Sequence, residues 1–235
     1  MAEIEIYSTP RRLYRYRSLM KADGKSSVER ELDAIINSYI FCPTFSEMND
    51  PMEGLLSPSK IFKNDLEIFE VKSKQISTAM SKLGIASFSE TYNHEPMWSH
   101  YAGQFNGICV AYDFKKLLSS LQTGAFVRMN YSEQAPILDT SSFRPDQMAR
   151  VALSTKNHRW MTEREWRLFA PSRGPVTYRE ASAASAIYIG SRVSSRIRSQ
   201  IFEILKPSRP TIPIFKMSID GYQIKFGRLL RRPTK

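Results

Sequence analysis

Apolar residues recur along the chain at two spacings, and each spacing predicts one kind of secondary structure. Apolar side chains three or four positions apart indicate a helix, and short alternating or continuous apolar runs indicate a strand. The first pattern predicts helices over residues 27–38, 60–83, 95–102, 115–121, 144–156 and 194–205. The second predicts strands over residues 4–8, 11–18, 39–42, 85–89, 107–113, 126–131, 163–168, 186–190, 212–219 and 222–226.

Local signals support several of these elements. Ser27 is a suitable N-cap for the first helix, and Pro96 falls in the first turn of the third, where a helix needs no backbone donor. Asp220 and Gly221 form a strong turn signal between the last two strands. Because clusters of strands alternate irregularly with helices, we expect an α+β fold with mixed or antiparallel sheets flanked by helices. The length predicts a single domain over residues 1–235, ending in a basic tail at 228–235.

Composition narrows the class of protein. Hydrophobic residues make up 42% of the chain and aromatic residues 11%, which indicates a folded protein rather than a disordered one. No apolar run approaches the ~18 residues of a membrane span, and the first residues lack the profile of a signal peptide. Cys42 and Cys109 lie far apart in apolar surroundings, which favours reduced core residues. We therefore expect a cytoplasmic protein without a membrane partner.

The chain is strongly basic. Its 34 Lys and Arg residues exceed its 23 Asp and Glu residues, so that the net charge is +11 and the pI is near 9.7. Such a charge favours nucleic acid or another polyanion as a partner and accelerates its association. A phosphate ligand or an acidic partner protein would also fit the charge.

Residues 158–169 hold an unusual concentration of charged and aromatic side chains. In a strand, Glu163, Glu165 and Arg167 would point to one face, and the apolar core would take the other. One interpretation is a solvated strand face with cross-strand ion pairs, each of small energetic value. The other is an acidic active site inside a basic protein.

Two further groups have both a structural and a functional interpretation. Arg15 and Arg17 alternate with Tyr14 and Tyr16, so that guanidinium groups suited to phosphates lie beside rings suited to stacking. The structural alternative is a strand with a polar outer face. Trp98 and Tyr101 are three positions apart, and they form either an aromatic wall on one helix turn or part of the core.

Metal chemistry has little support in the sequence. The three histidines and two remote cysteines lack the spacing of a zinc site, so we expect no metal. A magnesium-dependent nuclease would use Glu163 and Glu165 with Asp50 or Glu53, but Arg167 stands where such enzymes carry a lysine.

Five motifs occur in a fixed order, namely YRYRS at 14–18, NDPME at 49–53, MWSHYA at 97–102, GIC at 107–109 and WMTEREWR at 160–167. Over residues 13–188 the set resembles a bacterial family of domains of unknown function that is found in mobile and defence-associated contexts. The order of the motifs is also similar, more weakly, to that of the ADP-ribosyltransferase fold. Here the Ser-Thr-Ser triplet of that fold is missing, and the spacing to the glutamates is long.

The second resemblance implies NAD as the cofactor and assigns roles to residues. Glu165 would stabilise the oxocarbenium-like ribose, and Glu163 would steer or deprotonate the acceptor. The residues that would bind NAD are Arg15, Arg17, Tyr14, Tyr16, Trp98, Tyr101 and, in place of the missing triplet, Ser46. The residues that would contact the acceptor are Arg167, Arg164, Asn49 and Asp50.

The leading hypothesis is therefore an NAD-dependent ADP-ribosyltransferase, a toxin or defence effector that modifies RNA or DNA. By analogy, an antitoxin or other neutralising protein would be its partner. The first alternative is a nucleic-acid-binding or sensor module without catalysis, and the second is the magnesium nuclease.

Overall fold

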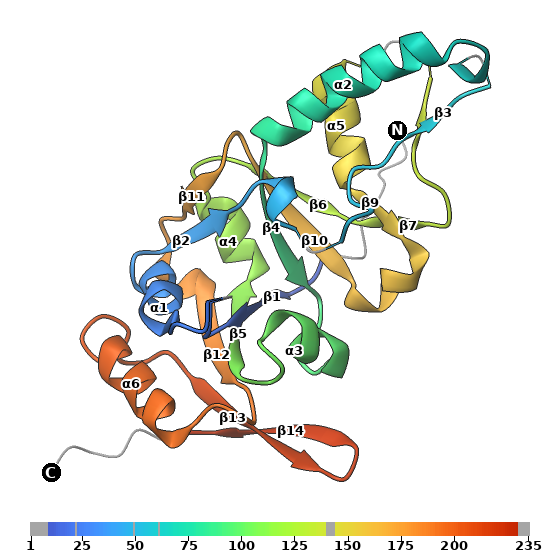
Figure 1. Cartoon of the computed structure of the whole chain (residues 1–235). Helices are drawn as coiled ribbons and strands as arrows, with labels where there is room; N and C mark the ends of the chain where they lie inside the picture. The colour runs from blue at the N-terminus through green and yellow to red at the C-terminus, as the bar shows by residue number, and fades with distance from the viewer. Residues whose placement is uncertain (1–8, 22, 49, 61, 140–143, 230–235) are drawn as a thin grey trace, which may run out of the picture. The chain divides into compact units, whose positions relative to one another are not determined.

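The computed structural model describes residues 9–21, 23–48, 50–60, 62–139 and 144–229. As predicted, the fold is α+β, with a mixed sheet flanked by helices (Figure 1). Internal contacts divide the chain into two compact units. Unit 1 comprises residues 1–39, 88–121 and 178–235, and unit 2 comprises residues 40–87 and 122–177. That the chain forms one domain stays a prediction.

Unit 1 is built on five neighbouring strands in the order β14-β13-β12-β5-β1. All neighbours are antiparallel except β12 and β13, which are parallel. The strands are β1 (Arg12–Ser18), β5 (Gly107–Asp113), β12 (Ala184–Ile189), β13 (Ile214–Asp220) and β14 (Gln223–Arg228). The helices are α1 (Val28–Ile36), α3 (Glu95–Tyr101), α4 (Phe114–Ser120), η4 (Ala181–Ala183) and α6 (Ser195–Leu205).

The strand register of unit 1 sorts its side chains onto two faces. Tyr16, Cys109, Tyr188 and Phe215 are direct neighbours across four strands and share one face. Helix α3 contacts β1 and packs Trp98 against this aromatic face.

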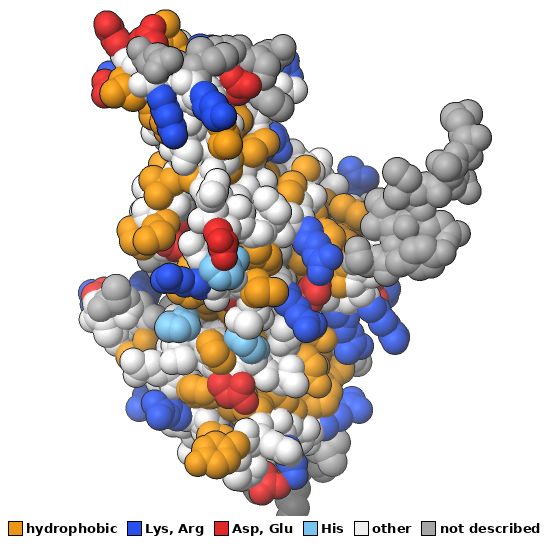
Figure 2. Space-filling model, turned by 90° about the vertical axis from the view of Figure 1, so that its right-hand side faces the viewer, with side chains coloured by type: hydrophobic (Ala, Val, Ile, Leu, Met, Phe, Trp, Pro, Cys, Tyr) orange, Lys and Arg blue, Asp and Glu red, His pale blue; other side chains and the backbone are white. Residues whose placement is uncertain are grey.

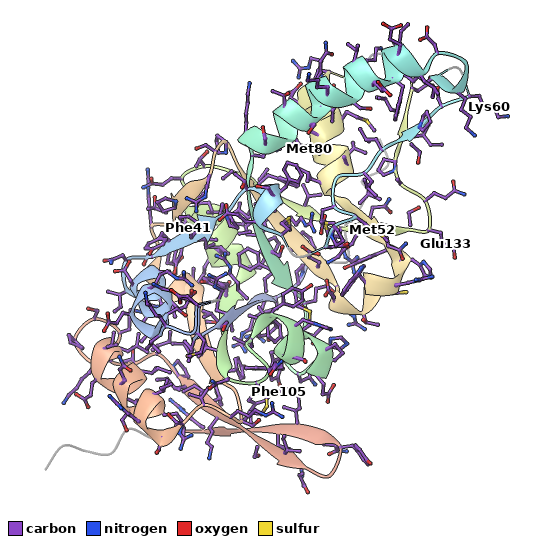
Figure 3. All side chains as sticks on the ribbon, in the orientation of Figure 1. Phe41, Met52, Lys60, Met80, Phe105 and Glu133 are labelled. Carbon is purple, nitrogen blue, oxygen red and sulfur yellow. The ribbon has the colours of Figure 1, made fainter. Side chains whose placement is uncertain are left out.

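Unit 2 combines strands with two helices that lie side by side, α2 (Leu66–Lys82) and α5 (Pro145–Leu153) (Figure 1). These helices bury an apolar cluster that includes Met80, which is labelled in Figure 3. The strands that lie wholly or mostly in this unit are β2 (Tyr39–Cys42), β3 (Ser57–Pro58), β4 (Gly84–Ser89), β6 (Ala125–Arg128), β7 (Asn130–Ser132), β8 (Ile137–Leu138), β9 (Thr155–Asn157), β10 (Glu165–Ala170) and β11 (Gly174–Thr177). Strand β10 lies between β4 and β6. Short 3-10 turns are η1 (Phe45–Glu47), η2 (Phe62–Asn64) and η3 (His158–Glu163).

Most predicted elements are confirmed, and the boundaries of 39–42 and 107–113 are those of β2 and β5. Ser27 is the N-cap of α1, and Pro96 lies in the first turn of α3. Asp220 and Gly221 lie at the turn of the β13–β14 hairpin. The predicted strand 4–8 and the tail residues 230–235 lie outside the described residues.

Several predicted boundaries differ from the structure. The helix predicted from residue 60 begins at Leu66, because the Asp65 side chain caps it by accepting from the Ile68 N–H. The helix predicted to reach residue 156 ends at Leu153, which places Lys156 in β9. The strand predicted over 126–131 is divided between β6 and β7, and the strands β3, β8, β9 and β11 were not predicted.

Candidate functional site

Five charged side chains of unit 2 converge in its interior and form what we call the buried charge network. Each is at most 6% exposed. They come from the loop before β3, from β9, from the end of η3 and from β10, and they are Glu53, Lys156, Glu163, Glu165 and Arg167.

Arg167 is the centre of the network. Its Nε donates to Glu165 Oε1 at 2.7 Å and its Nη2 donates to Glu165 Oε2 at 3.4 Å. Two further bonds, Nη1 to Oε2 at 2.8 Å and Nη2 to Oε1 at 2.6 Å, bind Glu53. Nη1 also donates to the Leu153 carbonyl at 2.6 Å, at the end of α5. The five N–H donors of a guanidinium can all be satisfied by this arrangement.

Lys156 is the second cation of the network. Its Nζ donates to Glu163 Oε2 at 2.7 Å and to Glu165 Oε2 at 3.0 Å. The same ammonium lies 4.9 Å from the ring centroid of Trp160, within the range of a cation–π interaction. Glu165 therefore accepts from both cations, and Glu163 and Glu165 meet at one ammonium group.

The backbone explains why Glu163 and Glu165 converge. The alternation of β10 places Glu165 and Arg167 on the same face. Arg164 adopts the left-handed conformation at φ 46° and ends η3, so Glu163 precedes the strand. The Glu165 N–H donates to the hydroxyl of Tyr131 at 2.7 Å and fixes the start of β10. The expectation that a strand begins at Glu163 is thus wrong.

The interpretation of a solvated strand face is also wrong, because Glu165 and Arg167 are buried and paired. Burial alone would raise the pKa of Glu165, but the positive charges of Arg167 and Lys156 outweigh it and lower that pKa to about 2. The carboxylates raise the pKa of Arg167 despite its burial. Glu165 is consequently a permanent carboxylate at neutral pH, as electrostatic stabilisation of a developing cation requires.

The predicted aromatic residues of unit 1 lie in a cluster of rings. Tyr14, Tyr16 and Trp98 are at most 7% exposed. The Tyr16 ring meets Trp98 edge-on at 5.3 Å, and its hydroxyl donates to the Thr91 carbonyl at 2.9 Å. Tyr101 is half-buried against the same cluster. The core interpretation is therefore confirmed for Trp98.

The predicted arginines of β1 have partners inside unit 1. Arg15 is 8% exposed, and its guanidinium lies 5.7 Å from the centroid of the Phe88 ring. Arg17 binds Glu31 through Nε at 2.6 Å and Nη2 at 3.0 Å. The interpretation of this strand as one with a polar outer face is wrong, because Leu13 to Tyr16 are all buried.

The remaining predicted residues of unit 2 lie in loops and turns. Ser46 is in η1, where its hydroxyl is 3.0 Å from Thr44 Oγ1. Asp50 accepts from the Met52 N–H at 2.9 Å and shapes the turn before Glu53. Arg164 is exposed. Asn49 lies outside the described residues.

Sequence reasoning missed Lys156 entirely and considered Glu53 only as a metal ligand. Glu53 lies far from β10 along the chain, and Lys156 lies in a segment that the sequence predicts as helix. No periodicity therefore connected either residue to Glu165. Tyr92, Tyr188 and Phe226, which join the aromatic cluster of unit 1, also went unnoticed. The alternation of Glu163, Glu165 and Arg167 was the one sequence signal that indicated this network.

Within the described part of the chain, no group of three or more His, Cys, Asp and Glu side chains is placed to hold a metal ion. Its helices are too short or too polar to cross a membrane. Cys42 and Cys109 are both buried.

Comparison with known proteins yields a family-model match over part of the chain. Neither a search of curated proteins nor a search of solved structures found a match. The weaker resemblance to ADP-ribosyltransferases stays a prediction. Four members of the buried charge network, from Lys156 to Arg167, lie inside the segment that matches a family model. Residues 97–168 match the family model described as "Protein of unknown function (DUF2971)", which confirms the resemblance to a family of unknown function over that segment.

Proposed function

We propose that the protein binds nucleic acid through unit 1. Unit 1 holds 21 Lys and Arg residues against 12 Asp and Glu residues, whereas unit 2 holds 13 against 11. Residues 178–235 alone contain 12 basic and three acidic residues. This concentration carries the proposal, because the salt-dependent affinity for a phosphate backbone grows with the number of cations that replace counterions.

Many of these cations lie at the surface. The exposed basic residues of 178–229 are Arg179, Arg192, Arg196, Lys206, Lys225 and Arg228. Figure 2 shows Lys and Arg side chains at several places on the face that it draws. Arg209 instead braces the fold by donating to the carbonyls of Ile35 and Ala184. The surface thus offers guanidinium and ammonium donors to phosphates.

Anisotropy titrations with a labelled single-stranded RNA of about 12 nucleotides test the proposal. The affinity should fall steeply between about 50 and 200 mM salt. The double variant Arg196→Glu/Lys206→Glu, in α6 and at its C-cap, should weaken binding at least about tenfold and flatten the salt dependence. The matched control is Lys74→Glu/Lys82→Glu on α2, which makes the same change in net charge at exposed sites of unit 2. Equal losses in both variants would contradict binding through unit 1.

One observation favours a second candidate, an ADP-ribosyltransferase that uses NAD and modifies nucleic acid. The carboxylates of Glu163 and Glu165 meet at Lys156, and Glu165 is held ionised. An ionised carboxylate next to the ribose of NAD would stabilise an oxocarbenium-like transition state. In this proposal Glu163 activates the nucleophile of the acceptor nucleic acid.

Labelled NAD incubated with a bacterial lysate tests this second candidate. Nuclease-sensitive label that disappears in Glu165→Gln would support it, and Glu133→Gln, at an exposed glutamate of the same unit, is the matched control. Thermal unfolding of both variants must accompany the assay, because Glu165 also stabilises unit 2. Label transfer by a Glu165→Gln protein would contradict the assignment of Glu165, and the absence of label with the unmodified protein would contradict the activity.

A further inference from the structure

Four aromatic rings of unit 1 pack against one another, and nucleic-acid binding as proposed above assigns them no role. Tyr188 lies at their centre. Phe215 stacks on it at 5.0 Å and 16°, Tyr92 lies 4.7 Å away at 31°, and Phe226 meets it edge-on at 5.1 Å. We call these four rings the aromatic platform.

The rings of the platform differ in exposure. Tyr188 is 6% exposed and packs on the buried cluster that contains Tyr14 and Trp98. Tyr92, Phe215 and Phe226 are only half-buried against that cluster. Phe105, labelled in Figure 3, packs against the same cluster from the loop after α3. Three rings therefore keep part of their surface outside the core.

Two arginines border the platform. Arg228 is the direct cross-strand neighbour of Phe215, so both side chains leave the β13–β14 ladder on the same face. Arg12 forms a hydrogen bond with the Tyr14 side chain. Burial raises the pKa of Tyr188 to about 12, although the positive charge of Arg12 acts to lower it. Both arginines are exposed. Aromatic faces are thus combined with cations in the unit that carries most of the net charge.

We propose that the aromatic platform stacks the bases of single-stranded nucleic acid, with Arg12 and Arg228 binding the flanking phosphates. This inference rests on the proposed nucleic-acid binding and deepens it by naming the strand form and the contact site. Charge complementarity selects this occupant, because an apolar peptide would leave both arginines without an anionic partner. A duplex is disfavoured, because its bases are already stacked and present no free face.

Substitutions that remove one ring at a time test the platform. Tyr92→Ala should weaken binding to a single-stranded oligo-uridine of about 12 nucleotides by about tenfold, whereas Tyr92→Phe should keep the affinity. Binding to a DNA duplex of similar length should change less than about twofold, because phosphate contacts carry it. The matched control is Tyr222→Ala, which removes a fully exposed tyrosine at the tip of the β13–β14 hairpin, away from the platform rings.

Cross-linking supplies a readout that does not depend on variant stability. An oligo-uridine containing 5-iodouridine should form photo-cross-links to Tyr92, Phe215 or Phe226 of the unmodified protein. Cross-links confined to other residues would overturn the platform, as would single-strand affinity that is unchanged in both Tyr92→Ala and Phe226→Ala. If the α6 charge-reversal variant still loses affinity in that case, nucleic-acid binding stands without the platform. No binding of either probe by the unmodified protein would overturn both proposals.

Discussion

The guanidinium of Arg167 donates two hydrogen bonds, of 2.6 and 2.8 Å, to the carboxylate of Glu53, a residue 114 positions earlier in the chain. The two side chains are 0% and 4% exposed. This contact fixes the turn that contains Asp50 to the middle of β10. It also makes the buried charge network a strong determinant of the stability of unit 2, because a buried ion that loses its partner is costly.

Removal of the Glu53 side chain should therefore strongly destabilise the folded protein. Glu53→Ala should lower the free energy of unfolding by about 3–5 kcal/mol, because Arg167 would remain buried with unpaired donors. Glu47→Ala is the matched control, since Glu47 makes a similar pair with Arg173, whose side chain is 54% exposed. That loss should be clearly smaller, because solvent screens an exposed pair. Chemical denaturation measures both values, and equal losses would contradict the importance of burial.

Acid should destabilise the network in a defined range of pH. The pKa of Glu165 is about 2 in the folded protein and lies near 4.5 without the network. Since the folded-state pKa is the lower one, the stabilisation is complete above about pH 4.5 and is lost as the pH falls towards 2. Free energies of unfolding measured across this range should decline less steeply in Glu165→Gln than in the unmodified protein. Parallel declines would exclude Glu165 as a main cause.

Gly84 of β4 should not tolerate a side chain. A Cβ at this position would lie 2.3 Å from the Ser172 carbonyl oxygen and 3.0 Å from Cys42 Cβ. Gly84→Ala should lower the free energy of unfolding by about 1–3 kcal/mol, because backbone must shift to make room. Gly227→Ala in β14 provides the comparison, since nothing lies within 4 Å of the added carbon. Thermal unfolding should show little change for Gly227→Ala, and a similar loss in both would refute the steric argument.

The two thiols should be unreactive in the folded protein. Cys42 and Cys109 are both 0% exposed, and burial raises the pKa of Cys109 well above its usual range. Because the thiolate is the reactive form, a thiol reagent such as 5,5′-dithiobis(2-nitrobenzoate) should modify neither residue until denaturant is added. Cys109→Ser should reduce the reactive thiols of the unfolded chain by one. Rapid modification of native protein would contradict the burial of these residues.

Local sequence information determined most of the secondary structure. Strand β5 combines a continuous apolar run with Gly107 at its start and Asp113, the N-cap of α4, at its end, so both boundaries follow from neighbouring residues. Pro96 similarly marks a helix start, because its fixed backbone suits the first turn. Ser27 occupies the N-cap position of α1, but its side chain makes no capping bond there, since its hydroxyl donates to the Ser18 carbonyl. The order of motifs, with Glu163, Glu165 and Arg167 close together, also identified the segment that contains most of the buried charge network.

Only the tertiary structure decided what those charged residues do. Lys156 and Glu53 reach Glu165 and Arg167 through chain folding, and hydrophobic periodicity carries no information about which distant charges will meet. Arg164 adopts the left-handed backbone conformation, so Glu163 lies outside the strand. A non-glycine residue adopts this conformation only when its surroundings enforce it. The aromatic platform likewise depends on the register of β12, β13 and β14, which brings Tyr188, Phe215 and Arg228 into one row although each looks like an ordinary strand residue in sequence.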